Sequence, residues 1–528
     1  MKIVSGSVLF FALFSFPFFG HAADFSVRSI DGIPISETQA IQNFYQNQAE
    51  IFLWVDHGQL TSEAKDIVRD IGESWKQGLN PLNYQYTILN EYVKNGIPQG
   101  REVDIEILFS NAFIKYAQDL SGMRLSPQEL KEDSKSWSRG VDGYSLLSIL
   151  SQTSKKAEFI QNLLPSDKTY QRLSKELTLI VEDLAKTPEP QIKPVKYPGL
   201  LKPGVVHPAI VNIRQKLGLS GESTLYDDDL KKQVEAFQSR HGLAPDGLIG
   251  PRSFNAIYQT RTQKLVKLIA NLERRRWVRL PMPSRYIAVN IPQMQLEAVD
   301  AGKVVFEMPV IIGQDKRPTT SFVANIVGVR FNPLWYVPDT IKKEDYLPAL
   351  QKNPEALRKK GIQFRVRSEE GMKKVAASEI NWNQVDQETL KSIQMYQDSG
   401  GENALGLIRV LMPNPYDIYL HDTNAPELFK KDDRALSSGC VRMSEPDRIA
   451  NFILSLNNGW TEEKIKKYVT SKKLIEIKAE KPLPVYLFYY TAWLDKKGDV
   501  IIANDLYQKD VDLVRALQSK GKIPFDLK

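Results

Sequence analysis

The chain has 528 residues, of which 42% are hydrophobic and 25% charged. This composition excludes an intrinsically disordered protein, and the length allows roughly three or four domains. Lys and Arg outnumber Asp and Glu by 70 to 63, a net charge of +7 without a long basic run, so the sequence does not predict a nucleic-acid-binding protein. The single cysteine, Cys440, excludes an intramolecular disulfide.

The first 22 residues have the pattern of a secretory signal peptide. Lys2 precedes an apolar run from Val8 to Phe19, and Gly20-His21-Ala22 supplies small residues before a cleavage site. A membrane anchor is the alternative, but the apolar run is too short to span a bilayer comfortably. We therefore expect residues 1–22 to be removed and the mature chain to be exported and soluble.

Residues 23–186 are predicted to form a helical domain. Apolar residues recur at helical spacing between Ile105 and Leu120, and Ser166-Asp167 would cap an amphipathic helix that continues towards Leu184. Because this region shows no constellation of catalytic residue types, we interpret it as a scaffold.

A proline-rich linker and a small helical domain follow. The six prolines between Lys186 and Pro208 disfavour helices and central strands, which predicts an extended linker over residues 187–207. In residues 208–260, helical spacing around Ile213 and Val234 precedes a glycine-rich loop, and Pro251 can begin a third helix. This segment is predicted to be a three-helix bundle.

The apolar periodicity changes to two after Arg285. Ile287 and Val289 alternate with their neighbours, and Asp300-Ala301-Gly302-Lys303 is typical of a hairpin turn. Residues 284–465 are predicted to form a mainly β domain with a helical, charged insertion at 339–401. The insertion would be a lid or a solvated decoration, and residues 466–528 would be a C-terminal extension that packs with the scaffold or the β domain.

The strongest functional signal combines His421 with Cys440. His421 is the nearest histidine to the only cysteine, with 18 residues between them. A cysteine nucleophile reacts as a thiolate, and a neighbouring histidine can take its proton and stabilise its charge, so a thiolate at neutral pH is expected. A buried inert thiol is the alternative. One Cys and one His are too few ligands for a zinc site, and neither a metal nor a cofactor is predicted.

The residues around the cysteine fit the same chemistry. Arg442 would share a strand face with Cys440, where its guanidinium could bind a substrate carboxylate. Ser437-Ser438-Gly439 could place backbone N–H groups around an oxyanion, and Gly439 allows dihedral angles closed to other residues.

These motifs support a family resemblance. His421 followed by Ser437-Ser438-Gly439-Cys440-Val441-Arg442 resembles the active-site signature of L,D-transpeptidases of the YkuD type. Arg317-Pro318-Thr319-Thr320 is similar to the family's substrate loop, and the segment 331–338 to its Asn-Pro-x-Trp-x-Val-Pro motif. The segment 234–251 resembles the signature of a peptidoglycan-binding three-helix module. Family members often have His where Ser438 stands.

The resemblance implies a multidomain α+β protein similar to the large YcbB-like members. Its parts would be a helical scaffold domain, a small three-helix peptidoglycan-binding-like domain and a mainly-β YkuD-type catalytic domain with a helical capping insertion. It would be a periplasmic protein of a Gram-negative bacterium.

The resemblance also implies a reaction. Cys440 would attack the carbonyl between the third residue and D-Ala of a tetrapeptide stem while His421 moves the proton. Backbone N–H groups at Ser438, Gly439 and Cys440 would hold the oxyanion. Substrate-binding side chains would come from Arg442, Tyr419, Ser437 and Trp335. An amine of a second stem would complete a 3→3 crosslink, whereas water as acceptor would give a carboxypeptidase or endopeptidase.

Stem peptides, as donor and acceptor, are the implied partners, and a carbapenem is expected to acylate Cys440. Glycan binding by residues 208–260 and a need for other cell-wall synthesis proteins stay open. A non-catalytic wall-binding scaffold is a competing interpretation. A papain-like peptidase is excluded because no histidine follows Cys440, and a sortase has wider spacing between its catalytic residues.

Overall fold

The computed structural model describes residues 25–48, 51–122, 124–125, 129, 137, 141–189, 195–278 and 281–525. The predicted signal peptide and part of the predicted linker lie outside the described residues. The chain divides into two compact units.

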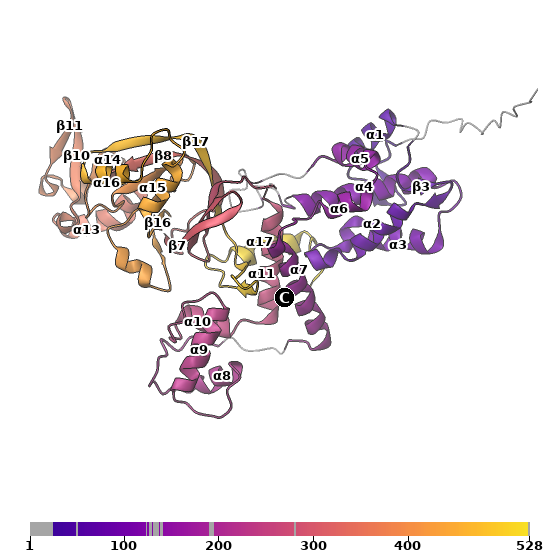
Figure 1. Ribbon diagram of the computed structural model, residues 1–528, viewed down its shortest axis with the longest axis horizontal. Coiled ribbons are helices and arrows are strands. Elements are labelled where there is room, and N and C mark those ends of the chain that lie inside the picture. The colour runs from indigo at the N-terminus through magenta and orange to yellow at the C-terminus, as the bar shows by residue number, and fades with distance from the viewer. Residues whose placement is uncertain are drawn as a thin grey trace, which may run out of the picture. The chain divides into compact units, whose positions relative to one another are not determined.

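The first unit is helical, as predicted for the scaffold, with two short hairpins (Figure 1). Its helices are α1 (Thr38–Asn47), α2 (Ser62–Gly72), α3 (Tyr86–Asn95), α4 (Glu102–Ser121), α5 (Gly143–Gln152) and α6 (Lys156–Gln161). The hairpins pair β1 (Ser29–Ile30) with β2 (Ile33–Pro34) and β3 (Val55–Asp56) with β4 (Gln59–Leu60).

A buried glutamate organises the first unit. The carboxylate of Glu106, on α4, accepts hydrogen bonds from Tyr45 Oη at 2.5 Å and from the backbone N–H groups of Leu53, Trp54 and Val55 at 2.5, 3.0 and 3.1 Å. Burial raises the pKa of the Glu106 carboxyl to about 7, although these hydrogen bonds favour its charged form. The carboxylate thereby holds the segment 53–55, at the start of β3, against α4.

The second unit includes three helices that pack on one another. They are α7 (Lys168–Lys186), α11 (Arg261–Arg276) and α17 (Lys509–Ser519). Asp167 caps α7 as predicted, since its side chain accepts a hydrogen bond from Tyr170 N. The sequence placed this helix in the scaffold, but its apolar residues Leu173 and Leu177 belong to the core that α11 and α17 share.

The predicted three-helix bundle is present in the same unit. It consists of α8 (Ala209–Lys216), α9 (Asp228–Arg240) and α10 (Pro251–Ile257), around a core that contains Ile210, Val234 and Phe254. Asp227 caps α9, and Pro251 begins α10 as the sequence predicted.

The β domain is a nine-stranded sheet in the order β15-β7-β16-β14-β13-β8-β17-β5-β6, and β6 also pairs with β7, so that eight strands form a closed ring. The strands are β5 (Tyr286–Asn290), β6 (Gln295–Asp300), β7 (Lys303–Gly313), β8 (Phe322–Phe331), β13 (Ile408–Leu411), β14 (Leu420–His421), β15 (Ala435–Ser437), β16 (Val441–Met443) and β17 (Ile475–Phe488). Ile287 and Val289 are buried while Tyr286, Ala288 and Asn290 face outwards, which confirms the period-two pattern. Two helices, α15 (Pro446–Leu454) and α16 (Glu463–Thr470), add residues to its core.

The β domain extends beyond residue 465, where the sequence analysis ended it. Strand β17 pairs with β8 over most of its length and in parallel with β5, because its apolar residues Val485 and Leu487 complete the core. The rest of the C-terminal region forms a hairpin of β18 (Ala492–Leu494) and β19 (Val500–Ile502), followed by α17.

The insertion is mixed and not purely helical as predicted. Its four-stranded sheet has the order β11-β10-β12-β9 and contains β9 (Trp335–Tyr336), β10 (Gln363–Ser368), β11 (Gly371–Val375) and β12 (Gln394–Gln397). Its helical segments are α12 (Asp339–Ile341), η3 (Lys342–Tyr346), α13 (Leu347–Lys352) and α14 (Gln387–Ser392). The many charged residues of this stretch hid the alternation of Phe364 and Val366 with Arg365 and Arg367 in β10.

A buried ion network joins α11 to its surroundings. Glu273 accepts hydrogen bonds from Arg124 Nε at 2.6 Å and Arg276 Nη2 at 2.7 Å, and Arg276 also donates to Tyr170 Oη at 2.8 Å. Burial alone would raise the pKa of the Glu273 carboxyl, but the two arginines outweigh burial and hold the pKa at about 2.

We expect Glu273→Gln to lower the free energy of unfolding by about 3–5 kcal/mol, because two buried guanidinium groups lose their carboxylate. Glu307→Gln is the control, since its partner Lys496 is exposed and the loss should be at most about 1 kcal/mol. Denaturant titrations followed by circular dichroism measure both. Because the pKa of Glu273 is depressed, its contribution to the free energy of unfolding is complete above pH 4.5, the ordinary pKa of the group. That contribution is lost as the pH falls towards 2. Equal losses in the two variants would contradict the network's role.

Candidate active site

Two short parallel strands bring the predicted residues together. Strand β14 pairs with β16 in the register Leu420 with Val441 and His421 with Arg442. Because paired residues in register point to the same face of a sheet, His421 and Arg442 lie side by side, while Leu420 and Val441 are buried in the core. Tyr419 and Cys440 come directly before these pairs, and Tyr419 O accepts a hydrogen bond from Val441 N at 3.0 Å.

A pocket of about 310 Å³ forms around these residues. Of the eight residues predicted for catalysis, oxyanion binding or substrate binding, all but Gly439 line this pocket: Trp335, Tyr419, His421, Ser437, Ser438, Cys440 and Arg442. The insertion closes another side of the pocket with Ile341, Asp345, Tyr346 and Lys360. Trp335 is 7% exposed and belongs to the insertion's core, so it joins that core to the pocket.

The cysteine is in the thiol form in this environment. Burial raises the pKa of the Cys440 thiol above its ordinary value, although Tyr419, Arg409 and Arg442 act in the opposite direction. Its Sγ atom lies 3.6 Å from the carbonyl oxygen of Asp417, to which the thiol donates. The direction of this pKa shift runs against the sequence-based expectation of a thiolate at neutral pH.

The histidine is neutral. His421 is 5% exposed, and burial together with the positive charges of Arg442 and Arg409 lowers the pKa of its imidazole to about 3. A neutral imidazole can accept a proton but carries no charge that would stabilise a resting thiolate. The electrostatic surroundings thus do not favour a standing ion pair between Cys440 and His421.

The backbone before Cys440 is held by buried hydroxyl groups. Ser437 Oγ donates to Cys440 O at 2.5 Å and accepts from Gly439 N at 3.2 Å. This bond occupies the Gly439 N–H, one of the three predicted oxyanion donors. Ser437 is 3% exposed and supports the loop, which differs from its predicted contact with substrate. Gly439 has φ of +111°, as its predicted conformational role requires.

Thr319 is a further support that the sequence analysis did not single out as a site residue. Its Oγ1 donates to Gly439 O at 2.8 Å and accepts from Gly313 N at 2.9 Å, and the side chain is fully buried. In a planar trans peptide the C=O and N–H point in opposite directions. By donating to Gly439 O, Thr319 orients the peptide bond between Gly439 and Cys440, so that the Cys440 N–H points away from Thr319.

Arg317 connects the catalytic loop to the insertion. It forms ion pairs with Glu344 at 2.6 Å and Asp345 at 2.7 Å, and its Nη1 lies 3.2 Å from Ser438 Oγ. The planar guanidinium of Arg317 binds the carboxylates of Glu344 and Asp345, both in η3, at the same time. Arg317 thereby fixes one edge of the insertion beside the pocket.

Arg409 is the second arginine at the site, and sequence reasoning missed it. It pairs in register with His421 on the neighbouring strand β13, and its guanidinium stacks on the Tyr419 ring at 3.9 Å. Within the described part of the chain, neither Arg409 nor Arg442 forms an ion pair with a carboxylate. The alternation of Arg409 with the apolar Ile408 and Val410 was the signal that could have placed it on the outer face of a strand.

The pocket therefore brings together the Cys440 thiol, the neutral His421 imidazole and the Arg442 guanidinium, while Arg409 lies against Tyr419 and does not line the pocket. Such a set suits acyl transfer on a substrate that carries a carboxylate. Among the described residues, no group of three or more His, Cys, Asp or Glu is arranged to hold a metal ion. The helices within the described ranges also include none with the length and apolarity of a membrane span.

Comparison with protein families identifies the domains. Residues 284–477 match the L,D-transpeptidase catalytic domain of the YkuD family, residues 39–177 match a scaffold domain, and residues 215–257 match a "Putative peptidoglycan binding domain". The chain thus contains a YkuD L,D-transpeptidase catalytic domain together with a peptidoglycan-binding domain and a helical scaffold.

Individual relatives agree with the domain assignment. A "Putative L,D-transpeptidase" of Haemophilus influenzae is 32% identical over 244 residues, which cover 46% of this chain and 48% of the relative. The chain therefore spans about half the length of the curated relative that it matches. The L,D-transpeptidase structures from Xylanimonas cellulosilytica and Stackebrandtia nassauensis are 13% and 12% identical, with TM-scores of 0.20 and 0.17. Each match covers 56% of this chain and 100% or 97% of the solved chain, and TM-scores this low do not constrain the function.

We expect iodoacetamide to alkylate Cys440 of the free protein more slowly at pH 7 than it alkylates an exposed thiol. The rate should still be rising above pH 9.0, the ordinary thiol value, because burial keeps the thiol protonated. His421→Ala should leave this profile nearly unchanged, since the imidazole is already neutral. Mass spectrometry measures the rates. Alkylation that persists well below the ordinary thiol pKa and is lost in His421→Ala would demonstrate an ion pair instead.

Proposed function

We propose that the protein is an L,D-transpeptidase that forms 3→3 crosslinks in peptidoglycan through a cysteine acyl-enzyme. The observation that carries this proposal is the pairing of β14 with β16, which puts His421 and Arg442 beside Cys440 in one pocket. The match of residues 284–477 to the catalytic domain supports the same reaction class.

In the proposed first step, Cys440 Sγ attacks the carbonyl between the third residue and D-Ala of a tetrapeptide stem. His421 takes the thiol proton as the carbon–sulfur bond forms, so that charge appears on the carbonyl oxygen only in the transition state. The N–H groups of Ser438 and Cys440 would donate to that oxygen, whereas the Gly439 N–H is already bound by Ser437. When the intermediate collapses, the C–N bond breaks, His421 returns its proton to the departing D-Ala amine, and a thioester remains.

In the second step, a side-chain amine on the third residue of another stem attacks the thioester. His421 accepts the excess proton of the amine and the Cys440 sulfur leaves and regains a proton, which restores the thiol and the neutral imidazole. Arg442, which lines the pocket and has no acidic partner within the described residues, would bind a carboxylate of the acidic stem peptide.

A hydrolase that uses water as acceptor is the second candidate. The same thioester would then yield a tripeptide stem without a crosslink, and nothing in the pocket lining excludes water. The single experiment that separates the two is analysis of products made by the full chain from tetrapeptide muropeptides.

We expect wild-type protein to produce 3→3 dimers from tetrapeptide muropeptides and Cys440→Ala to produce neither dimer nor tripeptide. His421→Ala should slow product formation by about 10²–10⁴-fold, the usual contribution of a general base. Liquid chromatography with mass spectrometry identifies the products, and circular dichroism verifies that each variant is folded. Dimer formation by Cys440→Ala at the wild-type rate would contradict the mechanism, and tripeptide without dimer from the wild type would favour the hydrolase.

The support of the oxyanion donor by Thr319 gives another prediction. Thr319→Val keeps the side-chain shape but removes the hydroxyl that holds Gly439 O, so a carbapenem should acylate Cys440 more slowly by up to about 10²-fold. Thr319→Ser keeps the hydroxyl and should acylate at close to the wild-type rate. Intact-mass measurements over time give the rates. If both variants react equally fast, Thr319 does not position the N–H of Cys440.

A further inference from the structure

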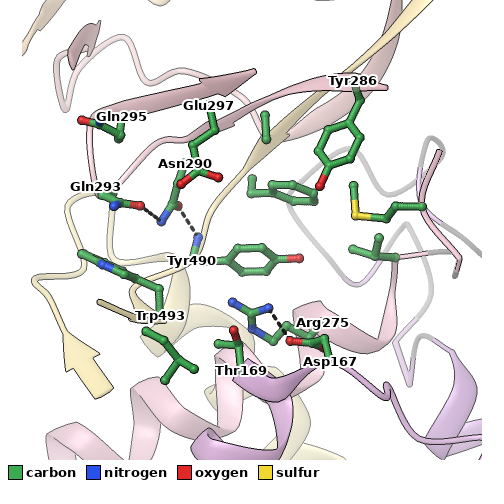
Figure 2. Close-up of a pocket in the computed structure, with 15 residues that line it drawn as sticks. Asp167, Thr169, Arg275, Tyr286, Asn290, Gln293, Gln295, Glu297, Tyr490 and Trp493 are labelled. Atoms are coloured by element: carbon green, nitrogen blue, oxygen red, sulfur yellow. Dashed lines mark hydrogen bonds and ion pairs between the residues drawn. The ribbon is translucent and has the colours of Figure 1, made fainter. Parts of the chain in front are cut away.

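A second pocket lies on the outer face of the β domain, away from Cys440 (Figure 2). Its volume is about 350 Å³, and it shares no lining residue with the Cys440 pocket. Outward-facing residues of β5 and β6 form one side. Arg275 of α11, the start of α7 and the segment from Tyr490 to Trp493 form the other side.

A small residue makes the hollow. Ala288 of β5 is paired with Tyr486 on β17 and with Glu297 on β6, so that it sits between two large neighbours in one row of the sheet. The next row contains Phe488, Asn290 and Gln295. The absence of a large side chain at 288 leaves space bounded by an aromatic side and an amide-rich side.

Aromatic rings form much of the wall. Phe488 and Tyr490 are stacked with their centroids 4.7 Å apart, and Figure 2 shows the Tyr490 ring extending into the middle of the pocket. The guanidinium of Arg275 lies 4.4 Å from the Tyr490 ring centroid and supports it from the side of α11. Tyr286 and Trp493 complete this apolar surface.

Polar groups with unused hydrogen-bonding capacity face the same space. The Asn290 side chain already has hydrogen-bond partners. Its Oδ1 accepts from Tyr490 N at 3.0 Å, and its Nδ2 donates to Gln293 Oε1 at 3.2 Å. In contrast, the side chains of Gln295, Glu297 and Thr169 make no hydrogen bond with any described residue. The pocket therefore presents an amide, a carboxyl and a hydroxyl group to a ligand.

The charges of the lining nearly cancel. Arg275 pairs with Asp167 at 3.3 Å. Burial, and then the negative charge of Glu307, raise the pKa of the Glu297 carboxyl above its usual value. An acidic peptide would face Glu297 without a free cation to balance its charge. The lining instead suits an uncharged ligand with both hydroxyl and amide groups and an apolar ring face.

We propose that this pocket binds an N-acetylated sugar of the peptidoglycan glycan strand. The inference rests on the proposed function, because the glycan is the uncharged part of the polymer that carries the stem peptides. Such a sugar combines C–H groups on its ring faces, which pack on aromatic rings, with hydroxyl and acetamido groups that match Gln295 and Glu297.

The position of Trp493 fits this proposal. Its indole lies against Gly242, which follows α9 in the peptidoglycan-binding domain, so closely that a Cβ at Gly242 would be 2.9 Å from the ring. The new site thus adjoins the domain matched to peptidoglycan binding. A strand could contact both surfaces and remain on the protein while its stem peptides reach the catalytic pocket.

The test uses the full chain and chitotetraose, an uncharged tetramer of N-acetylglucosamine that carries no peptide. Hydrogen–deuterium exchange should show protection by chitotetraose at residues 286–297. Ala288→Phe fills the hollow and should weaken binding measured by calorimetry by at least about tenfold, the equivalent of about 1.4 kcal/mol. Glu297→Ala, which removes a polar group from an outward position, should also weaken binding. Lys303→Ala, at the hairpin outside the pocket, is the matched control and should bind like the wild type.

Protection confined to residues 208–260, or equal affinities for wild type and Ala288→Phe, would overturn the inference. Protection of residues 286–297 by a free tetrapeptide stem, with none by chitotetraose, would show a peptide site and also overturn it. Acylation of wild-type Cys440 by a carbapenem is measured on the same preparation. Acylation without sugar binding at 286–297 contradicts only the glycan site, whereas sugar binding without acylation contradicts only the proposed catalytic mechanism.

Discussion

The parallel pairing of β14 with β16 is the constraint on which the site depends. Two strands of two and three residues set His421 opposite Arg442 and place Cys440 two residues before Arg442. Antiparallel pairing would run one strand the other way, and a shift of one residue would turn the site residues into the core. Burial of Leu420 and Val441 in the closed sheet prevents such a shift, so the stability of the core also fixes the catalytic geometry.

Burial explains the protonation state of the site. Burial within the sheet and beside the insertion raises the pKa of the Cys440 thiol and lowers that of the His421 imidazole. Two nearby arginines push the imidazole further towards its neutral form. These shifts favour the uncharged forms of both groups before substrate binds. In the proposed reaction, charge would then develop only during attack. Ser437 and Thr319 hold the loop before Cys440 in place for that step.

The β domain uses its outer residues at two separate places. Near β14 and β16, outward residues that include His421 and Arg442 line a pocket beside the insertion, and Arg409 lies against Tyr419 of that pocket. Near β5 and β6, outward residues form an aromatic and amide-lined hollow with little net charge. This division would allow one domain to distinguish the acidic peptide part of a polymer from its uncharged sugar part.

The sequence by itself determined the local features: the cap of α7 at Asp167, the start of α10 at Pro251, the alternation in β5, and the candidates Cys440 and His421, which line one pocket. These follow from spacing and residue type over a few positions. Tertiary structure alone decided that β17 completes the sheet, that Arg409 stands beside His421, that Ser437 occupies the Gly439 N–H, and that the thiol is protonated. The reason is that register, burial and electrostatic surroundings arise from residues far apart in the chain, whose approach no local pattern encodes.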